Sequence, residues 1–198
     1  MTRCKLVETI VSAGVLALWA GHANAEEFSA RLNGFEELGA LNNQTGAILS
    51  EGTGTVSLTL GKKAGGKTAG AIDYTLTYSN VGMTPPLTGT VTQAHIHFGK
   101  ARDSGGILVY FCTNLLLPAT FTGPAPQPCP KNSGTVTGTF KAANVQAIAG
   151  QNVSAGDFDA LMDAITSNTA YANIHTTALG AGEIRGQCCS EDEKREDR

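Results

Sequence analysis

The stretch Ile72-Asp73-Tyr74-Thr75-Leu76-Thr77-Tyr78 alternates apolar and polar side chains at every position. Alternation with a period of two, rich in Thr and Tyr, is typical of a strand that buries one face. The pattern recurs, with glycine-rich breaks between several of the runs, at 28–32, 56–60, 93–98, 107–111, 136–140, 172–174 and around 184. About eight short strands in one chain predict an all-β fold, with antiparallel strands arranged as a sandwich or barrel.

One later segment follows a helical period instead. Its apolar residues recur at positions i, i+3, i+4 and i+7, namely Phe158, Leu161, Met162 and Ile165. Ser154 and Asp157 precede this run and resemble a capping box. The segment predicts one short amphipathic helix, whose apolar stripe packs across an open end or edge of the sheets.

Both ends of the chain differ in composition from the strand-rich part. Residues 1–25 combine basic residues, a short apolar run and the tripeptide Ala23-Asn24-Ala25, which together resemble a secretory signal with its cleavage site. Residues 190–198 hold eight charges, and such a segment cannot bury enough surface to fold. We therefore expect a signal peptide over 1–25, one domain over 26–189 and a disordered tail over 190–198. The mature protein is expected in the periplasm or the extracellular medium.

The charge balance and the length of the apolar runs exclude two classes of function. The 198 residues carry a formal net charge of −3, and no basic patch follows the predicted signal. Such a chain is a poor ligand for nucleic acid, whose phosphates are bound by Lys and Arg. The apolar run of the signal is too short to cross a bilayer, and no later run is longer. We expect neither a nucleic-acid partner nor a membrane span in the mature chain.

Four cysteines follow the predicted signal, an even number that suits disulfide formation after export. Cys112 and Cys129 enclose a proline-rich stretch, so we expect a disulfide between them that constrains this excursion. Cys188 and Cys189 are adjacent in sequence, where a bridge between the two is strained. Pairing elsewhere, pairing between chains and two free thiols stay open as alternatives for them.

The three histidines that follow the predicted signal lie in two strand-like runs. Successive strand residues face opposite sides, so His95 and His97 share the polar face of the first run, and His175 lies on the polar face of the second. If these strands are neighbours, one outward face collects six polar side chains: His95, His97, His175, Asn173, Glu183 and Arg185.

That set of residues supports two interpretations. Three imidazoles suit copper or zinc, and three histidines with an open position are also the pattern of catalytic zinc. The alternative is a structural network of cross-strand hydrogen bonds among His and Thr side chains. In the metal hypothesis the three histidines are the ligands, and Asn173, Glu183 and Arg185 surround them. We expect Glu183 and Arg185 to pair with each other or with loop backbone rather than to act in catalysis.

Several segments resemble known motifs in their order and spacing. They are the opening segment 28–37, the central Ala94-His95-Ile96-His97-Phe98-Gly99, and the closing segments 171–176 and 182–187. Together they resemble the CHRD domain, a module first described in chordin and common in exported bacterial proteins. The resemblance covers about residues 28–188 and implies an immunoglobulin-like β-sandwich, but little biochemistry, because the molecular function of the family is largely undefined. Growth-factor binding is not carried over, since nothing here resembles the cysteine-rich repeats of chordin.

A second resemblance concerns the histidines alone. His95-Ile96-His97 is similar to the His-Val-His motif of copper–zinc superoxide dismutase, which is also a Greek-key sandwich with a disulfide-held loop. Three histidines are too few for the bridged two-metal site of that family. This shortfall argues against catalytic dismutation and leaves a mononuclear copper or zinc site as the metal hypothesis.

The sequence contains no GxSxG nucleophile elbow and no GxGxxG motif after a strand. It favours an exported, non-catalytic binding or structural module with an unidentified extracytoplasmic ligand or protein partner. The alternative is a mononuclear copper or zinc protein that uses the three histidines, with redox chemistry of the superoxide dismutase kind.

Overall fold

The computed structural model describes residues 25–38, 46–62 and 68–190. The predicted signal and tail lie outside these residues except for Ala25 and Ser190, and Ser190 belongs to a strand. The elements follow in the order β1 (Glu26–Asn33), η1 (Gly34–Glu36), β2 (Thr53–Lys62), β3 (Thr68–Ser79), β4 (Val91–Phe98), β5 (Ile107–Thr113), β6 (Gly134–Lys141), η2 (Ala142–Asn144), η3 (Ala149–Gln151), α1 (Phe158–Thr166), β7 (Ala170–Thr176), β8 (Ile184–Gln187) and β9 (Cys189–Ser190).

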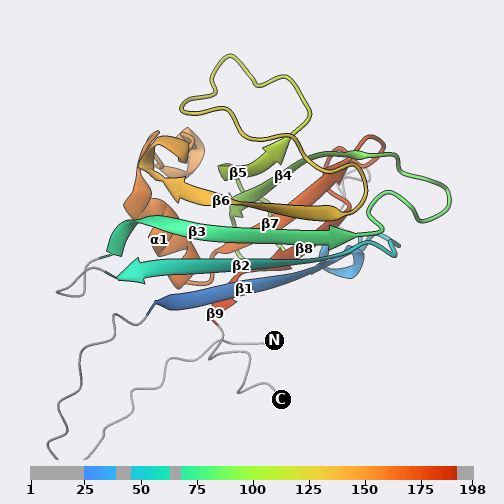
Figure 1. Ribbon diagram of the computed structural model, residues 1–198, viewed down its shortest axis with the longest axis horizontal. Coiled ribbons are helices and arrows are strands. Elements are labelled where there is room, and N and C mark those ends of the chain that lie inside the picture. Colours follow the sequence, from blue (N-terminus) through green and yellow to red (C-terminus); the bar gives the residue numbers. More distant parts are fainter. Residues whose placement is uncertain (1–24, 39–45, 63–67, 191–198) are drawn as a thin grey trace, which may run out of the picture.

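The strands of the described residues form one sheet bent into two layers. Eight of them are hydrogen-bonded in the order β5-β4-β7-β8-β1-β2-β3-β6, and β9 pairs with β1. In Figure 1, β1, β2, β3 and β6 lie in front, with β4, β5, β7 and β8 behind them. The path passes from one layer to the other where Asn33 is paired with Arg185. The predicted all-β fold with one helix is confirmed, as a single nearly closed sheet.

The alternating apolar residues of the sequence become the core between the layers. Leu58, Ile72 and Leu76 are completely buried, while the intervening Thr and Ser side chains of β2 and β3 face outward. The rings of Tyr74 and Phe140 stack with their centroids 4.2 Å apart. Burial of each large side chain of this kind stabilises the fold by about 1.5–3 kcal/mol.

The disulfide loop joins the two ends of the sheet, β5 and β6. The predicted disulfide is present, with an S–S distance of 2.05 Å between Cys112 and Cys129. Within the loop, the carbonyl of Gln127 accepts a hydrogen bond from the N–H of Thr113 in β5, at 2.9 Å. The Gln127 side-chain amide donates to the carbonyl of Thr137 in β6, at 2.8 Å. The loop therefore bridges the two edge strands and covers the gap between them.

The predicted helix is present as α1, at one end of the layers (Figure 1). Its predicted apolar stripe is buried at Leu161, Met162 and Ile165. The N-cap is Asp157, whose side chain accepts a hydrogen bond from the N–H of Ala160 at 3.0 Å. The helix is thus capped by the second residue of the predicted capping box.

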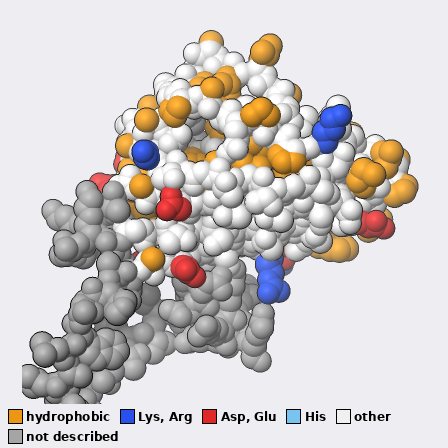
Figure 2. All heavy atoms as spheres, in the orientation of Figure 1, with side chains coloured by type: hydrophobic (Ala, Val, Ile, Leu, Met, Phe, Trp, Pro, Cys, Tyr) orange, Lys and Arg blue, Asp and Glu red, His pale blue; other side chains and the backbone are white. Residues whose placement is uncertain are grey.

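Figure 2 shows where apolar side chains reach the surface on one face. They gather on the protruding loops, whereas the sheet between the loops is mostly uncharged and polar. Met83 and Leu87 lie in the loop before β4, and Leu115 and Leu116 lie in the disulfide loop, all with more than 45% of their surface exposed. In the part of the chain that the structure describes, no helix is long and apolar enough to cross a membrane.

Candidate metal centre

The three histidines come from two neighbouring strands, β4 and β7. In their antiparallel register, His95 lies opposite Asn173, His97 lies opposite Tyr171, and His175 lies opposite Gln93. Residues paired in this way share one face of a sheet. The intervening Ala and Ile residues of both strands are buried in the core on the other face. The structure therefore brings all three imidazoles to the same face.

The register of β4 with its other neighbour, β5, is interrupted at both histidines. It shifts between Ala94 and His95 and again between Ile96 and His97. Such bulges re-aim side chains and are common beside functional sites. The register places Tyr110 opposite His95, and its ring meets the imidazole edge to face, with the centroids 4.4 Å apart.

The histidine face was predicted to point outward, and it is covered instead. His95 is completely buried, and only 9% of the surface of His97 and 5% of that of His175 is exposed. Backbone from two loops reaches the imidazoles, through Gly105 in the loop after β4 and Gly180 in the loop after β7. Alternation along a strand predicts which side chains share a face, but it does not predict which loops fold over that face.

Those two loop contacts fix the tautomers of two rings. The Nδ1 of His97 lies 2.9 Å from the carbonyl oxygen of Gly105, and the Nδ1 of His175 lies 3.0 Å from that of Gly180. A carbonyl oxygen only accepts hydrogen bonds, so each Nδ1 carries the hydrogen and donates it. In a neutral ring the Nε2 atom then carries no hydrogen and has a free lone pair. Metal-ligating histidines are commonly held by such a second hydrogen bond.

The remaining nitrogens converge without hydrogen-bond partners. One ligand atom from each of the three rings can be chosen so that all lie within 4.8 Å of one another. Among the described residues, the buried side-chain atoms without a partner include both nitrogens of His95 and the Nε2 atoms of His97 and His175. Each buried polar atom left unpaired costs about 1–3 kcal/mol. Each of the three rings therefore offers at least one nitrogen that could bind a metal ion and that the protein leaves without a hydrogen-bond partner.

Burial also keeps the rings uncharged. It lowers the pKa of His97 and that of His175 to about 4. The pKa of His95 is lowered well below 6.5, mainly by burial and to a smaller extent by the neighbouring imidazoles. Neutral imidazole is the form that binds metal ions, so the centre does not need to lose protons at neutral pH before it binds one.

Arg185 holds the loop that carries Gly105. Its guanidinium donates hydrogen bonds to the carbonyls of Lys100 and Asp103, at 3.1 and 2.9 Å. It also lies 3.4 Å from the ring centroid of Tyr171, and that ring stacks on His97 with an interplanar angle of 2°. Arg185 thus pairs with loop backbone, one of the two arrangements expected for it, and it supports His97 indirectly.

Glu183 lies in a different cluster. Its buried carboxylate accepts four hydrogen bonds, from Ser50, Gly82, Thr88 and Thr176. Thr176 has the same parity along β7 as the core residue Ile174, so this cluster lies toward the core side of the strand. Glu183 precedes the first residue of β8, where the chain is still part of the loop and strand alternation does not apply. It ties loops together and does not join the histidines.

Asn173 does lie on the histidine face, with a partner that sequence reasoning missed. Its side-chain Nδ2 donates to Oε2 of Glu37, and both residues are buried, at 2% and 5% exposed. Gly182 packs against them, since a Cβ there would lie 2.3 Å from Glu37 Oε2. We call Glu37 and Asn173 the carboxylate–amide pair. Glu37 lies within the opening motif 28–37, but nothing in the sequence connects it with residue 173.

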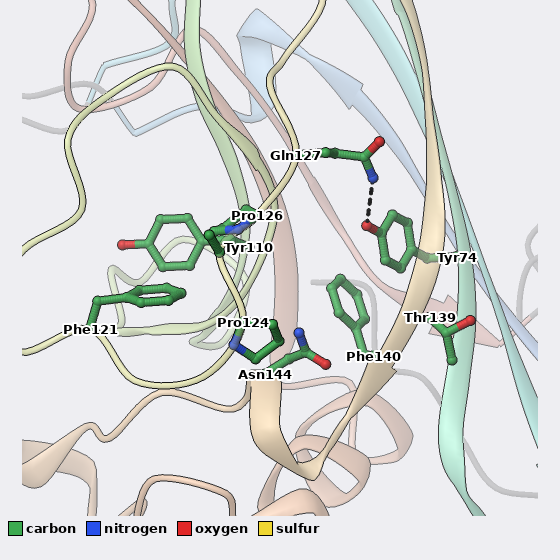
Figure 3. A pocket seen from close by; sticks show the side chains of 10 residues that line it. Tyr74, Tyr110, Phe121, Pro124, Pro126, Gln127, Thr139, Phe140 and Asn144 are labelled. Atoms are coloured by element: carbon green, nitrogen blue, oxygen red, sulfur yellow. Dashed lines mark hydrogen bonds between the residues drawn. The ribbon is translucent and has the colours of Figure 1, made fainter.

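A separate hollow is lined in part by Tyr110, the residue whose ring also meets His95 (Figure 3). It has a volume of about 230 Å³ and is lined mainly by rings and prolines from the disulfide loop and the core. Figure 3 shows Gln127 donating to the hydroxyl of Tyr74, a hydrogen bond of 3.2 Å. The lining residues include no His, Cys, Asp or Glu, so this hollow offers none of the usual metal ligands.

Comparison with known proteins agrees with the motifs. The family model of the CHRD domain matches residues 28–188, which is most of the chain. The chain therefore belongs to the CHRD-domain family, and the resemblance based on the four motifs is confirmed. No curated protein and no solved structure matches the chain.

Proposed function

We propose that this chain is an exported CHRD-domain module that holds one copper or zinc ion between His95, His97 and His175. The observation that carries the proposal is the convergence of three buried imidazoles whose ligand nitrogens have no hydrogen-bond partner. Imidazole is a good ligand for both ions, and the two ordered tautomers present Nε2 lone pairs. Three protein ligands leave one position for a further ligand.

The alternative, a structural network of hydrogen bonds, accounts for only part of the geometry. The contacts of His97 and His175 with Gly105 and Gly180 do hold two loops. They use one nitrogen of each ring and leave the other nitrogen buried. His95 is completely buried and neither of its nitrogens has a hydrogen-bond partner. An apolar residue would fill that position without this cost, so a purely structural role does not explain a histidine there.

Two observations support export of the module. The Cys112–Cys129 disulfide is of the kind that persists in oxidising compartments. CHRD domains are also commonly extracellular, and this family covers most of the chain. We infer that the protein acts in the periplasm or the medium as a binding module, with a ligand or protein partner still to be identified. A bound ion would supply charge and a position for an additional ligand, and redox chemistry if the ion is copper.

The proposal is tested by metal analysis of protein recovered from the periplasm or the medium. We expect close to one equivalent of copper or zinc in the wild type, and a higher melting temperature when metal is restored to stripped protein. His175→Ala should abolish both. Gln93→Ala, which changes the residue opposite His175 on the same face, should preserve them. Absence of bound metal, together with no thermal response to added copper or zinc, would refute the proposal.

A further inference from the structure

The carboxylate–amide pair determines which end of the Asn173 side chain is free. A carboxylate only accepts hydrogen bonds, so the Asn173 atom that meets Glu37 is the Nδ2 donor. The other atom, Oδ1, is buried and has no hydrogen-bond partner among the described residues. The orientation of the amide is therefore imposed by its neighbour, and an acceptor is left on the histidine face.

The unpaired oxygen belongs to a residue on the same face of the sheet as the ligand nitrogens. Asn173 lies directly opposite His95 and two positions before His175 in β7. Among the described residues, six buried side-chain atoms have no hydrogen-bond partner, and all six belong to residues of this face. Besides the four histidine nitrogens and Asn173 Oδ1, the group includes Oε1 of Gln187, a residue that lies opposite Tyr171 in the strand register. No described residue donates a hydrogen to the Asn173 oxygen, and a ligand with an O–H or N–H group would supply one.

We propose that Asn173 makes the metal centre selective for a small protic ligand, with water as the simplest case, and that Glu37 enforces this selectivity by fixing the amide. The inference rests on the proposed function of the histidines. The ligand occupies the remaining position beside the three imidazoles and donates a hydrogen bond to Asn173 Oδ1. An aprotic anion in the same position faces the lone pairs of that oxygen and is disfavoured.

Glu37→Gln is expected to reverse this preference. The other carboxylate oxygen of Glu37, Oε1, accepts a hydrogen bond from the N–H of Leu38 at 2.9 Å. A glutamine at position 37 keeps its oxygen on Leu38 and turns its NH2 group toward Asn173. The Asn173 amide must then flip to offer Oδ1 to that group, which puts its Nδ2 donor where Oδ1 lies in the wild type.

The test is an optical titration of azide, which has no hydrogen to donate, into the copper(II)-loaded protein. Gaining a donor in place of an opposed acceptor is worth about one hydrogen bond, so azide should bind about tenfold more tightly to Glu37→Gln than to wild type. Glu36→Gln removes the same charge from the exposed neighbouring residue and should leave azide affinity within about twofold of wild type.

A double-mutant cycle separates the amide from the charge of Glu37. If Glu37 acts by orienting Asn173, the gain in azide affinity from Glu37→Gln disappears when Asn173 is replaced by alanine. An equal gain in both backgrounds overturns the inference, because charge alone would then explain it. Side-chain amide NMR signals of Asn173 supply a readout in metal-free protein, where they should shift in Glu37→Gln and not in Glu36→Gln. Copper stoichiometry, measured first, shows separately whether the proposed function fails.

Discussion

Acid should destabilise the metal-free protein through its buried histidines. Burial lowers the pKa of His97 and of His175 to about 4, against 6.5 for an exposed ring. Because the folded value is the lower one, the unfolded chain takes up protons first as the pH falls. The stability is then complete above pH 6.5 and is lost between pH 6.5 and about 4. At about 1.4 kcal/mol per pH unit, each ring accounts for about 3 kcal/mol, a large part of the usual 5–15 kcal/mol of a domain.

Urea unfolding of metal-free protein at a series of pH values measures this loss. The free energy of unfolding should be flat near neutral pH and then fall by up to about 1.4 kcal/mol per pH unit for each ring that titrates. His97→Gln removes one such ring and should make the fall less steep by that amount. If the wild type and His97→Gln show the same pH dependence, burial of this imidazole is not a source of acid sensitivity, and the argument fails.

Three further predictions concern the frame around the centre. Replacing Cys112 with serine should lower the free energy of unfolding by about 3 kcal/mol in urea, because the loop is no longer closed. Glu183→Gln should cost about 2–3 kcal/mol by the same assay, since its buried carboxylate accepts four hydrogen bonds, whereas exposed Glu51→Gln should change little. Gly182→Ala places a Cβ against the carboxylate–amide pair and should weaken copper binding about tenfold in a competition titration, while Gly150→Ala, with open space around it, should not. Equal effects of the two glycine variants would contradict the packing argument.

Local patterns in the sequence predicted most of the fold. The alternation over 72–78 corresponds to part of β3, and the helical spacing from Phe158 to Ile165 corresponds to α1. The disulfide also followed from local composition, because prolines between Cys112 and Cys129 mark a long excursion. Parity along the strands was sufficient to place the three histidines on one face once their strands were neighbours.

The features that the sequence did not predict depend on loops. The burial of the histidine face, the carbonyls of Gly105 and Gly180, and the position of Glu37 all follow from how connections fold over the sheet. Such connections have no period from which their course can be inferred. Glu183 shows the same limit, since it lies just outside a strand and parity assigned it to the wrong cluster.

The order of the strands has a consequence for how the chain matures. β4 and β7 are adjacent in the sheet, yet β5, β6 and α1 separate them along the chain. A folding chain in which β7 has not yet paired with β4 has only the two imidazoles of β4 in place and cannot bring the three histidines together. Ion capture would thus be a late event that reports correct long-range topology, unlike a zinc finger whose ligands are close in sequence. Because an ion held only by the native topology stabilises that state by mass action, the metal supply would govern how much correctly folded protein persists.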